Sequence, residues 1–215
     1  VLAMDISTSM LARDFNPDRI GAAKDIAIQF IAERPSDRIG VVVFAGESFT
    51  QSPLTTDRPT LINLMKEVEC GIIEDGTAIG NGLANAVARL KDSPAKSRVI
   101  ILLTDGVNNR GEIAPQMAIE IAKTYGIRVY TIGVGAMGEA PYPMMTPYGV
   151  KEMMVKVEID EELLKQIATE TGGEYFRATD NTNLLAVYRK ITGREKSQTT
   201  VDSFQLHKEA FSEFA

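Results

Sequence analysis

The sequence predicts an α/β protein with an open, doubly wound, mostly parallel sheet, one short antiparallel edge strand and helices on both faces. Runs of consecutive apolar residues rich in Val and Ile recur along the chain, as expected for strands that are buried on both faces. These runs alternate with stretches of helical periodicity, which is typical of a parallel sheet with crossover helices. The 215 residues, 44% of them hydrophobic, suffice for one domain with a substantial core.

The strands are predicted from their apolar runs. Four runs are apolar on both faces and are expected to be parallel, namely residues 1–6, 39–45, 98–104 and 127–134. Residues 174–178 form a shorter run and are expected to be an edge strand. Residues 48–52 alternate in polarity after a turn at Gly46, which predicts an antiparallel hairpin partner for the second strand.

The helices are predicted from an apolar stripe with a start or stop signal. Their expected ranges are 18–33, 57–69, 78–91, 114–125, 160–171 and 181–192. Pro115 is suited to a first helical turn, and Gly126 follows the end of the same helix. Asp160 opens the next helix, and Gly172 and Gly173 end it.

One segment interrupts this alternation. Residues 136–158 contain three prolines, at positions 141, 143 and 147, and cannot form a helix. We expect a surface insertion after the fourth parallel strand, folded as a small hairpin on the face that holds the candidate metal site. The predicted organisation is one domain over residues 1–192, followed by a tail over residues 193–215.

Composition excludes several classes of function. The chain has 29 acidic and 23 basic residues, a net charge of −6, so we expect no nucleic-acid partner. It has a single cysteine, Cys70, and a single histidine, His207 in the tail. This scarcity argues against thiolate metal sites, His-rich metal sites and Ser-His-Asp catalysis. The remaining chemistry is that of carboxylate, hydroxyl and backbone oxygen.

Oxygen-bearing side chains follow two of the predicted strands. Asp5, Ser7 and Ser9 end the first strand, and Asp105 ends the strand at 98–104. Thr77 lies just before the helix at 78–91. Ligands of open α/β sheets bind beyond the carboxyl ends of strands, so these side chains can converge there. Two carboxylates with three hydroxyls suit a hard cation such as Mg²⁺, with Mn²⁺ or Ca²⁺ as alternatives.

The pattern resembles a known family. Asp5-x-Ser7-x-Ser9, Thr77 and Thr104-Asp105-Gly106 are similar to the metal-ion-dependent adhesion site of von Willebrand factor A (VWA) domains. The resemblance implies that Ser7, Ser9 and Thr77 are hydroxyl ligands and that Asp5 and Asp105 are the acidic pair. It covers residues 1–192, and four further segments resemble the bacterial aerotolerance (BatA-type) branch: residues 34–40, 44–46, 104–109 and 171–173.

The resemblance implies a binding function rather than an enzymatic one. We expect the metal to take a Glu or Asp from a protein partner, in a membrane-anchored complex related to aerotolerance or stress. Other VWA proteins of the same complex are candidate partners. The branch also implies the bacterial inner membrane, with the domain in the periplasm. Anchoring would use segments outside this sequence, since the chain opens without Met and the apolar tail is expected to approach a membrane helix.

Other functions are weaker alternatives. A Mg²⁺-dependent hydrolase would need Asp5 as a base or nucleophile. In a metal-independent scaffold, the same hydroxyls would only cap turns and the helix at 78–91. Residues 133–138 match a dinucleotide fingerprint, but prolines follow where a helix is required. Residues 14–18 resemble a calcium loop, but Arg19 stands where Gly is required, so we expect a solvated loop there.

The loops beside the predicted metal provide candidates for partner selectivity. We expect loops 8–18, 74–77 and 106–112 to surround the metal together with the insertion. Arg13, Asn108, Asn109 and Arg110 lie in these loops and are the candidate partner-binding residues.

Overall fold

The computed structural model describes residues 1–147 and 149–195, and most of the predicted tail lies outside this range. Within these residues, six strands form one sheet in the order β3-β2-β1-β4-β5-β8. The strands are β1 (Leu2–Asp5), β2 (Ile39–Phe44), β3 (Ser48–Thr55), β4 (Val99–Thr104), β5 (Arg128–Val134) and β8 (Tyr175–Ala178). Only the β2–β3 pairing of this sheet is antiparallel. The predicted sheet, including its edge strands, is confirmed.

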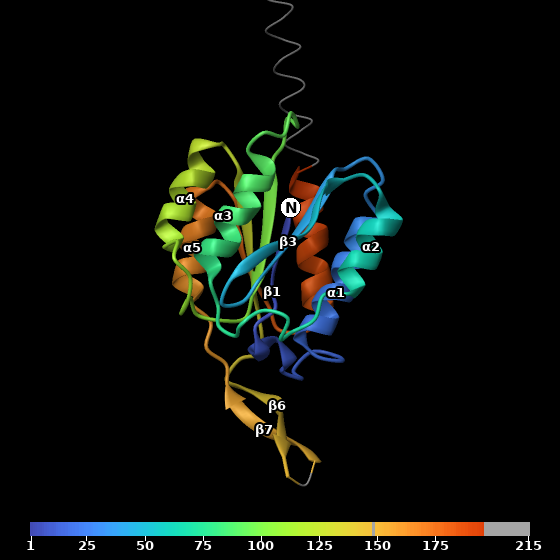
Figure 1. Ribbon diagram of the computed structural model, residues 1–215, viewed down its shortest axis with the longest axis vertical. Coiled ribbons are helices and arrows are strands. Elements are labelled where there is room, and N and C mark those ends of the chain that lie inside the picture. The colour runs from blue at the N-terminus through green and yellow to red at the C-terminus, as the bar shows by residue number, and fades with distance from the viewer. Residues whose placement is uncertain (148, 196–215) are drawn as a thin grey trace, which may run out of the picture.

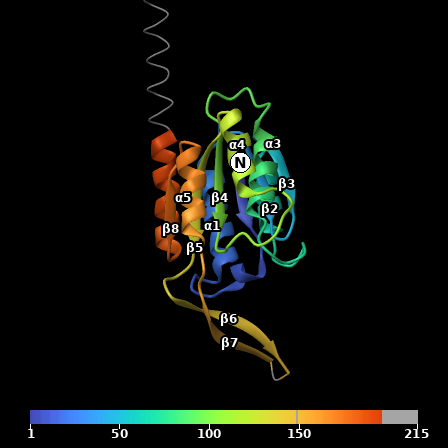
Figure 2. The same cartoon turned by 90° about the vertical axis from the view of Figure 1, so that its left-hand side faces the viewer.

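Helices cover both faces of the sheet, as the alternating sequence predicts (Figures 1 and 2). On one face lie α1 (Arg19–Ala32), α2 (Arg58–Lys66) and a helix over residues 181–195; on the other lie α3 (Ile79–Leu90), α4 (Pro115–Thr124) and α5 (Glu161–Glu170). Successive strand side chains point to opposite faces, so Leu2 and Met4 enter one core and Val1 and Ala3 the other. The central parallel strands are apolar on both faces because both faces are buried.

Side-chain caps start four of these helices. The carboxylates of Asp18, Asp57, Asp160 and Asp180 accept hydrogen bonds from backbone amides in the first turns of α1, α2, α5 and the helix over residues 181–195. Pro115 opens α4, and Gly126 follows that helix with a positive φ of 58°. The start signals in the sequence therefore have the expected structural basis.

Three predicted boundaries need correction. The helix expected over residues 57–69 ends at Lys66, and the strand expected over residues 48–52 continues to Thr55 past a register shift. The helix expected to end at 192 includes residue 195. Glu195 accepts hydrogen bonds from Tyr130 Oη at 2.6 Å and Arg128 Nη1 at 2.7 Å, so it packs against β5 and extends the helix past the expected end.

The insertion is a two-stranded antiparallel hairpin, β6 (Glu139–Thr146) and β7 (Gly149–Lys156). It extends from the same end of the molecule as the blue segment after β1 (Figures 1 and 2). The predicted hairpin is confirmed. No helix among residues 1–147 and 149–195 is long and apolar enough to cross a membrane.

The sheet order sets the position of the candidate site. β1 pairs with β2 on one side and β4 on the other, and the chain winds outward in opposite directions from this pair. The carboxyl ends of β1 and β4 therefore flank the point where strand order reverses, which is the usual ligand position in such sheets. Asp5 is the last residue of β1, and Asp105 directly follows β4.

Candidate metal centre

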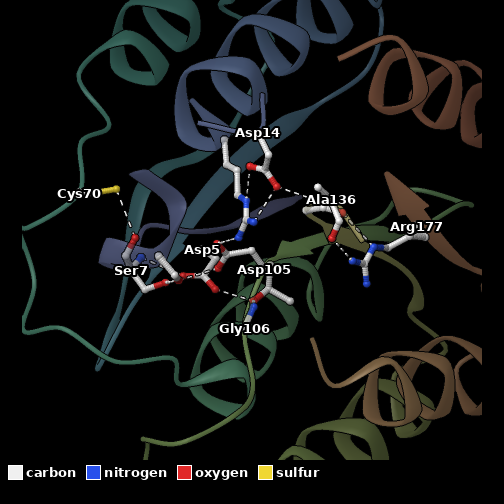
Figure 3. A network of polar contacts seen from close by, with 12 residues as sticks. Asp5, Ser7, Asp14, Cys70, Asp105, Gly106, Ala136 and Arg177 are labelled. Atoms are coloured by element: carbon white, nitrogen blue, oxygen red, sulfur yellow. Dashed lines mark hydrogen bonds and ion pairs between the residues drawn. The ribbon is translucent and has the colours of Figure 1, made fainter. Parts of the chain in front are cut away.

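The structure brings the predicted oxygen side chains together at the carboxyl ends of β1 and β4. Ser7 is the N-cap residue of a short 3-10 helix, η1 (Thr8–Leu11), and Ser9 is the second residue of that helix. The Ser7 and Ser9 hydroxyl oxygens are 2.9 Å apart, and the Ser9 hydroxyl donates to Asp105 Oδ1 at 2.7 Å. Figure 3 shows Asp5, Ser7 and Asp105 around this point. The predicted convergence of the two strand ends is therefore present in the structure.

Asp5 is held by two donors on opposite sides of its carboxylate. The Ser7 amide donates to Oδ1 at 2.9 Å, and the Thr104 hydroxyl donates to Oδ2. Thr104 also accepts the Gly106 amide at 3.2 Å, so one hydroxyl links both strand ends. Asp5 is fully buried, and burial together with the nearby charge of Asp105 raises the pKa of Asp5 to about 7.

Asp105 is ion-paired with Arg19, the first residue of α1. Arg19 Nη1 donates to Asp105 Oδ2 at 2.6 Å, while Arg19 Nε and Nη2 donate to the two Asp14 oxygens at 2.8 and 2.7 Å. The side chains of Arg19 and Asp14 are each 4% exposed, and that of Asp105 is fully buried. The expectation of a solvated loop at residues 14–18 was therefore wrong for Asp14.

The cost of burying these charges explains why they are paired. Burial raises the pKa of Asp105, although the Arg19 charge acts in the opposite direction. Burial also opposes ionisation of Asp14, but hydrogen bonds from Arg19 and the Ala136 amide outweigh it and lower the Asp14 pKa. An arginine in the first turn of a helix gives no sequence signal of this role, because its partner Asp105 lies 86 positions along the chain.

Thr77 completes the set from the loop before α3. It is 4% exposed, and a Cβ added to Gly106 would lie 3.1 Å from Thr77 Oγ1, so this hydroxyl faces the backbone that follows Asp105. Among the described residues, the Thr77 hydroxyl makes no hydrogen bond. Thr77 also does not cap α3, whose N-cap residue is Ala78 and has no side-chain cap. The oxygen of the Thr77 hydroxyl is therefore available to coordinate a metal ion.

Two asparagines of the next loop fix the position of Thr77. Asn109 Oδ1 accepts the Thr77 amide and Asn108 Oδ1 accepts the Ile79 amide, both at 2.9 Å. The Thr77 carbonyl in turn accepts the Asn109 amide at 3.0 Å. The loop after β4 therefore holds the loop before α3 against the site. This positioning role of Asn108 and Asn109 was not predicted from the sequence. Their partner-binding role stays a prediction.

The other two candidate partner-binding residues are exposed at the edge of the site. Arg13 Nη1 lies 2.9 Å from Glu152 Oε1 of β7, and Arg110 Nη2 lies 3.3 Å from Glu74 Oε1. Both pairs lie on the surface, where ion pairs contribute little to stability. The partner-binding role of Arg13 and Arg110 also stays a prediction.

Three of the five oxygen side chains border a cavity of about 450 Å³, whereas Asp5 and Ser7 are not among its lining residues. Ser9, Thr77 and Asp105 line its floor, and residues of the β6–β7 hairpin form part of its wall. The described residues contain no cluster of three or more His, Cys, Asp or Glu side chains that could hold a metal ion. A metal here would depend on hydroxyl ligands together with the Asp5 and Asp105 carboxylates.

These residues fit a hard divalent cation. Two buried carboxylates with raised pKa values lie beside one another, and a cation between them would relieve both the burial cost and their repulsion. With all three carboxylates ionised, Asp5, Asp14 and Asp105 carry three negative charges against the single charge of Arg19, a net −2 that a bound cation would offset. Neutral hydroxyls and carboxylates are the ligands that Mg²⁺ and Ca²⁺ prefer.

Comparison with known proteins agrees with the fold. The model of the von Willebrand factor type A domain matches residues 1–190. The crystal structure of BatB from Bacteroides thetaiotaomicron is 30% identical, with a TM-score of 0.75 over 91% of this chain and 97% of that one. An aerotolerance-related membrane protein from Bacteroides fragilis is also 30% identical, with a TM-score of 0.72 over 88% and 95% of the two chains.

A more distant structure shares the fold. The mussel byssus proximal thread matrix protein 1, with zinc occupying its metal-ion-dependent adhesion site, is 24% identical, with a TM-score of 0.65 over 88% of this chain and 43% of that one. The chain spans 58 to 63% of the length of the first curated relatives it matches. The family match, which covers nearly all the described residues, identifies the chain as a member of the von Willebrand factor type A domain family.

Proposed function

We propose that this domain binds a divalent cation, Mg²⁺ first among them, and uses it to bind an acidic side chain of a protein partner. The observation that supports the proposal most strongly is the convergence of the Ser9 hydroxyl, the Thr77 hydroxyl and the Asp105 carboxylate at the floor of one open cavity. The bound cation would supply a localised positive charge at that floor.

The residues of the site have separate tasks in this proposal. Ser7, Ser9 and Thr77 would hold the cation, with Asp5 and Asp105 as the acidic pair. Both Asp5 oxygens already accept hydrogen bonds from Ser7 and Thr104, which fixes the carboxylate and leaves its charge to act at short range. Because most of the ligands are neutral, the cation would retain charge that attracts a carboxylate from outside.

We propose binding rather than hydrolysis. A hydrolase at this site would need Asp5 as its base or nucleophile, and both oxygens of that carboxylate are engaged by neighbouring donors. A metal-independent scaffold would use the hydroxyls as caps, yet neither Ser7 nor Thr77 gives its side chain to a helix cap. Neither alternative has an observation in its favour.

The cellular setting follows from the relatives rather than from the site. One relative is described as an aerotolerance-related membrane protein. We propose that this domain belongs to a membrane-anchored, aerotolerance-related complex of the bacterial inner membrane, lies on the periplasmic side, and binds other VWA proteins of that complex.

Isothermal titration with Mg²⁺ tests the metal site. We expect saturable binding by the wild type, and binding at least tenfold weaker for Thr77→Ala and Asp105→Asn. Ser52→Ala removes a buried hydroxyl of β3 that hydrogen-bonds to a backbone carbonyl away from the site, and it should bind Mg²⁺ like the wild type. Absence of Mg²⁺, Mn²⁺ and Ca²⁺ binding by the folded wild-type protein would exclude the proposal.

A further inference from the structure

The β6–β7 hairpin presents an unusual apolar surface for an exposed element. Met144, Met145, Met153, Met154, Val150 and Val155 are between 37 and 86% exposed and all lie on it. Apolar patches on exposed protein surfaces often mark interaction sites, and methionine adapts well to varied partners. The patch therefore calls for an explanation beyond local packing.

The register of the hairpin divides these side chains between two faces. Tyr142 is opposite Met153 and Ala140 is opposite Val155, so these residues share one face with Met144. Tyr142, Met144 and Val155 line the cavity above the candidate metal ligands. Met145 and Met154 belong to the other face by the same alternation. One apolar face is therefore continuous with the metal site.

The hairpin is held in this position by contacts at its base. The Arg13 amide donates to the Pro141 carbonyl at 2.7 Å, and the Ala136 amide donates to Asp14 Oδ2 at 2.6 Å. Arg177 donates to the Gly135 and Ala136 carbonyls at 3.1 and 2.9 Å (Figure 3). Through Asp14 and Arg19, the base of the hairpin is joined to Asp105 itself.

We infer that the cavity-facing side of the hairpin, formed by Tyr142, Met144, Met153 and Val155, is a docking surface for an extended segment of a partner protein in which apolar residues flank the acidic residue that binds the metal. This inference rests on the proposed function. The chain that carries a carboxylate bound at the cavity floor would pass along the wall, where Tyr142, Met144 and Val155 provide an apolar surface beside the Lys156–Glu158 ion pair. Apolar side chains beside the acidic residue would bury that wall.

A protein segment fits this surface better than a lipid surface does. The cavity-facing side is turned toward the metal ligands rather than away from the domain. Glu139 and Glu152 balance Lys151 and Lys156 on the hairpin, and the chain as a whole carries −6, so no positive charge favours an anionic membrane. A carboxylate-bearing chain matches both the metal and the apolar wall.

The test begins with a random dodecapeptide library displayed on phage and selected on the immobilised protein with Mg²⁺, with elution by EDTA. We expect the eluted peptides to share an Asp or Glu with large apolar residues within two positions. The dissociation constant of a synthetic peptide from this pool is then measured against three proteins: the wild type, Met144→Ser/Val155→Thr and Met145→Ser/Met154→Ser. The last variant makes comparable changes on the opposite face.

The inference predicts that Met144→Ser/Val155→Thr binds the peptide at least tenfold more weakly, with Mg²⁺ affinity and melting temperature unchanged, and that the opposite-face variant binds like the wild type. Selection of peptides whose acidic residue has no apolar neighbours would overturn the inference and leave the metal-dependent function intact. Equal dissociation constants for the two double variants would have the same consequence. Sedimentation of the protein with phosphatidylglycerol vesicles, lost in Met144→Ser/Val155→Thr, would assign the face to lipid and also overturn it. Failure of the wild type to bind Mg²⁺ would remove both proposals.

Discussion

Removal of the Arg19 side chain should be among the most destabilising single changes near the site. Arg19→Met deletes three charge-assisted hydrogen bonds of 2.6 to 2.8 Å and leaves the buried carboxylates of Asp14 and Asp105 without their cation. Breaking a buried ion pair by removing one partner costs about 3–5 kcal/mol, because the remaining charge is uncompensated. We therefore expect the free energy of unfolding to fall by about 3–5 kcal/mol.

Urea denaturation in EDTA at pH 7.5 measures this loss. The chain has no tryptophan, so far-ultraviolet circular dichroism is the suitable signal. Arg13→Met is a matched control, since it breaks a pair with Glu152 whose side chains are 46 and 55% exposed. The control should cost less than about 1 kcal/mol. Arg19→Lys keeps the charge but cannot bridge two carboxylates in the same geometry, so its loss should be intermediate.

Two results would refute this reasoning. A loss for Arg19→Met as small as that for Arg13→Met would show that the buried carboxylates are neutral or hydrated without Arg19. A loss that does not diminish at pH 5 would also contradict it, because Asp105 has a pKa raised by burial and should protonate more readily once Arg19 is gone.

Two further predictions concern the metal. Gly106→Ala places a Cβ 3.1 Å from Thr77 Oγ1 and should weaken Mg²⁺ binding about tenfold, a free-energy change of about 1.4 kcal/mol. Calorimetry tests this. Gly193→Ala, whose added Cβ meets no atom of the described residues within 4 Å, should leave Mg²⁺ binding unchanged. Mg²⁺ affinity should rise with pH toward 8 and fall below pH 7, because Asp5 has a pKa of about 7 without metal and must lose its proton to act as an anion. Titrations from pH 6 to 8 check this, and a pH-independent affinity would contradict it.

The parts of this fold that the sequence predicts are those determined by burial. The runs at β1, β2, β4 and β5 carry apolar residues on both faces because helices cover both faces of the sheet, and this leaves a pattern that local analysis detects. The boundaries that were missed depend on contacts between distant segments. Glu195 continues the last helix because its carboxylate reaches Tyr130 and Arg128 on β5, about 65 positions earlier in the chain.

The same distinction applies to the site. Asp5 and Asp105 could be placed from the sequence because each ends a recognisable strand, and the strand ends of an open sheet meet at one edge. Arg19 could not, because it opens α1 behind an aspartate cap and resembles any solvent-facing residue of a first turn. Its burial depends on how loop 12–18 folds over the end of β4, and no local pattern encodes that approach.

The Arg19–Asp14 pair also relates the two parts of the proposed binding surface. Asp14 Oδ2 accepts both Arg19 Nη2 and the Ala136 amide at the base of the hairpin, while Arg19 Nη1 holds Asp105. A shift of Asp105 toward a bound cation would therefore be transmitted to the hairpin base through three short contacts. Since the hairpin forms a wall of the cavity over the same cation, the position of that wall and the position of the acidic ligand are set by one buried cluster of charges.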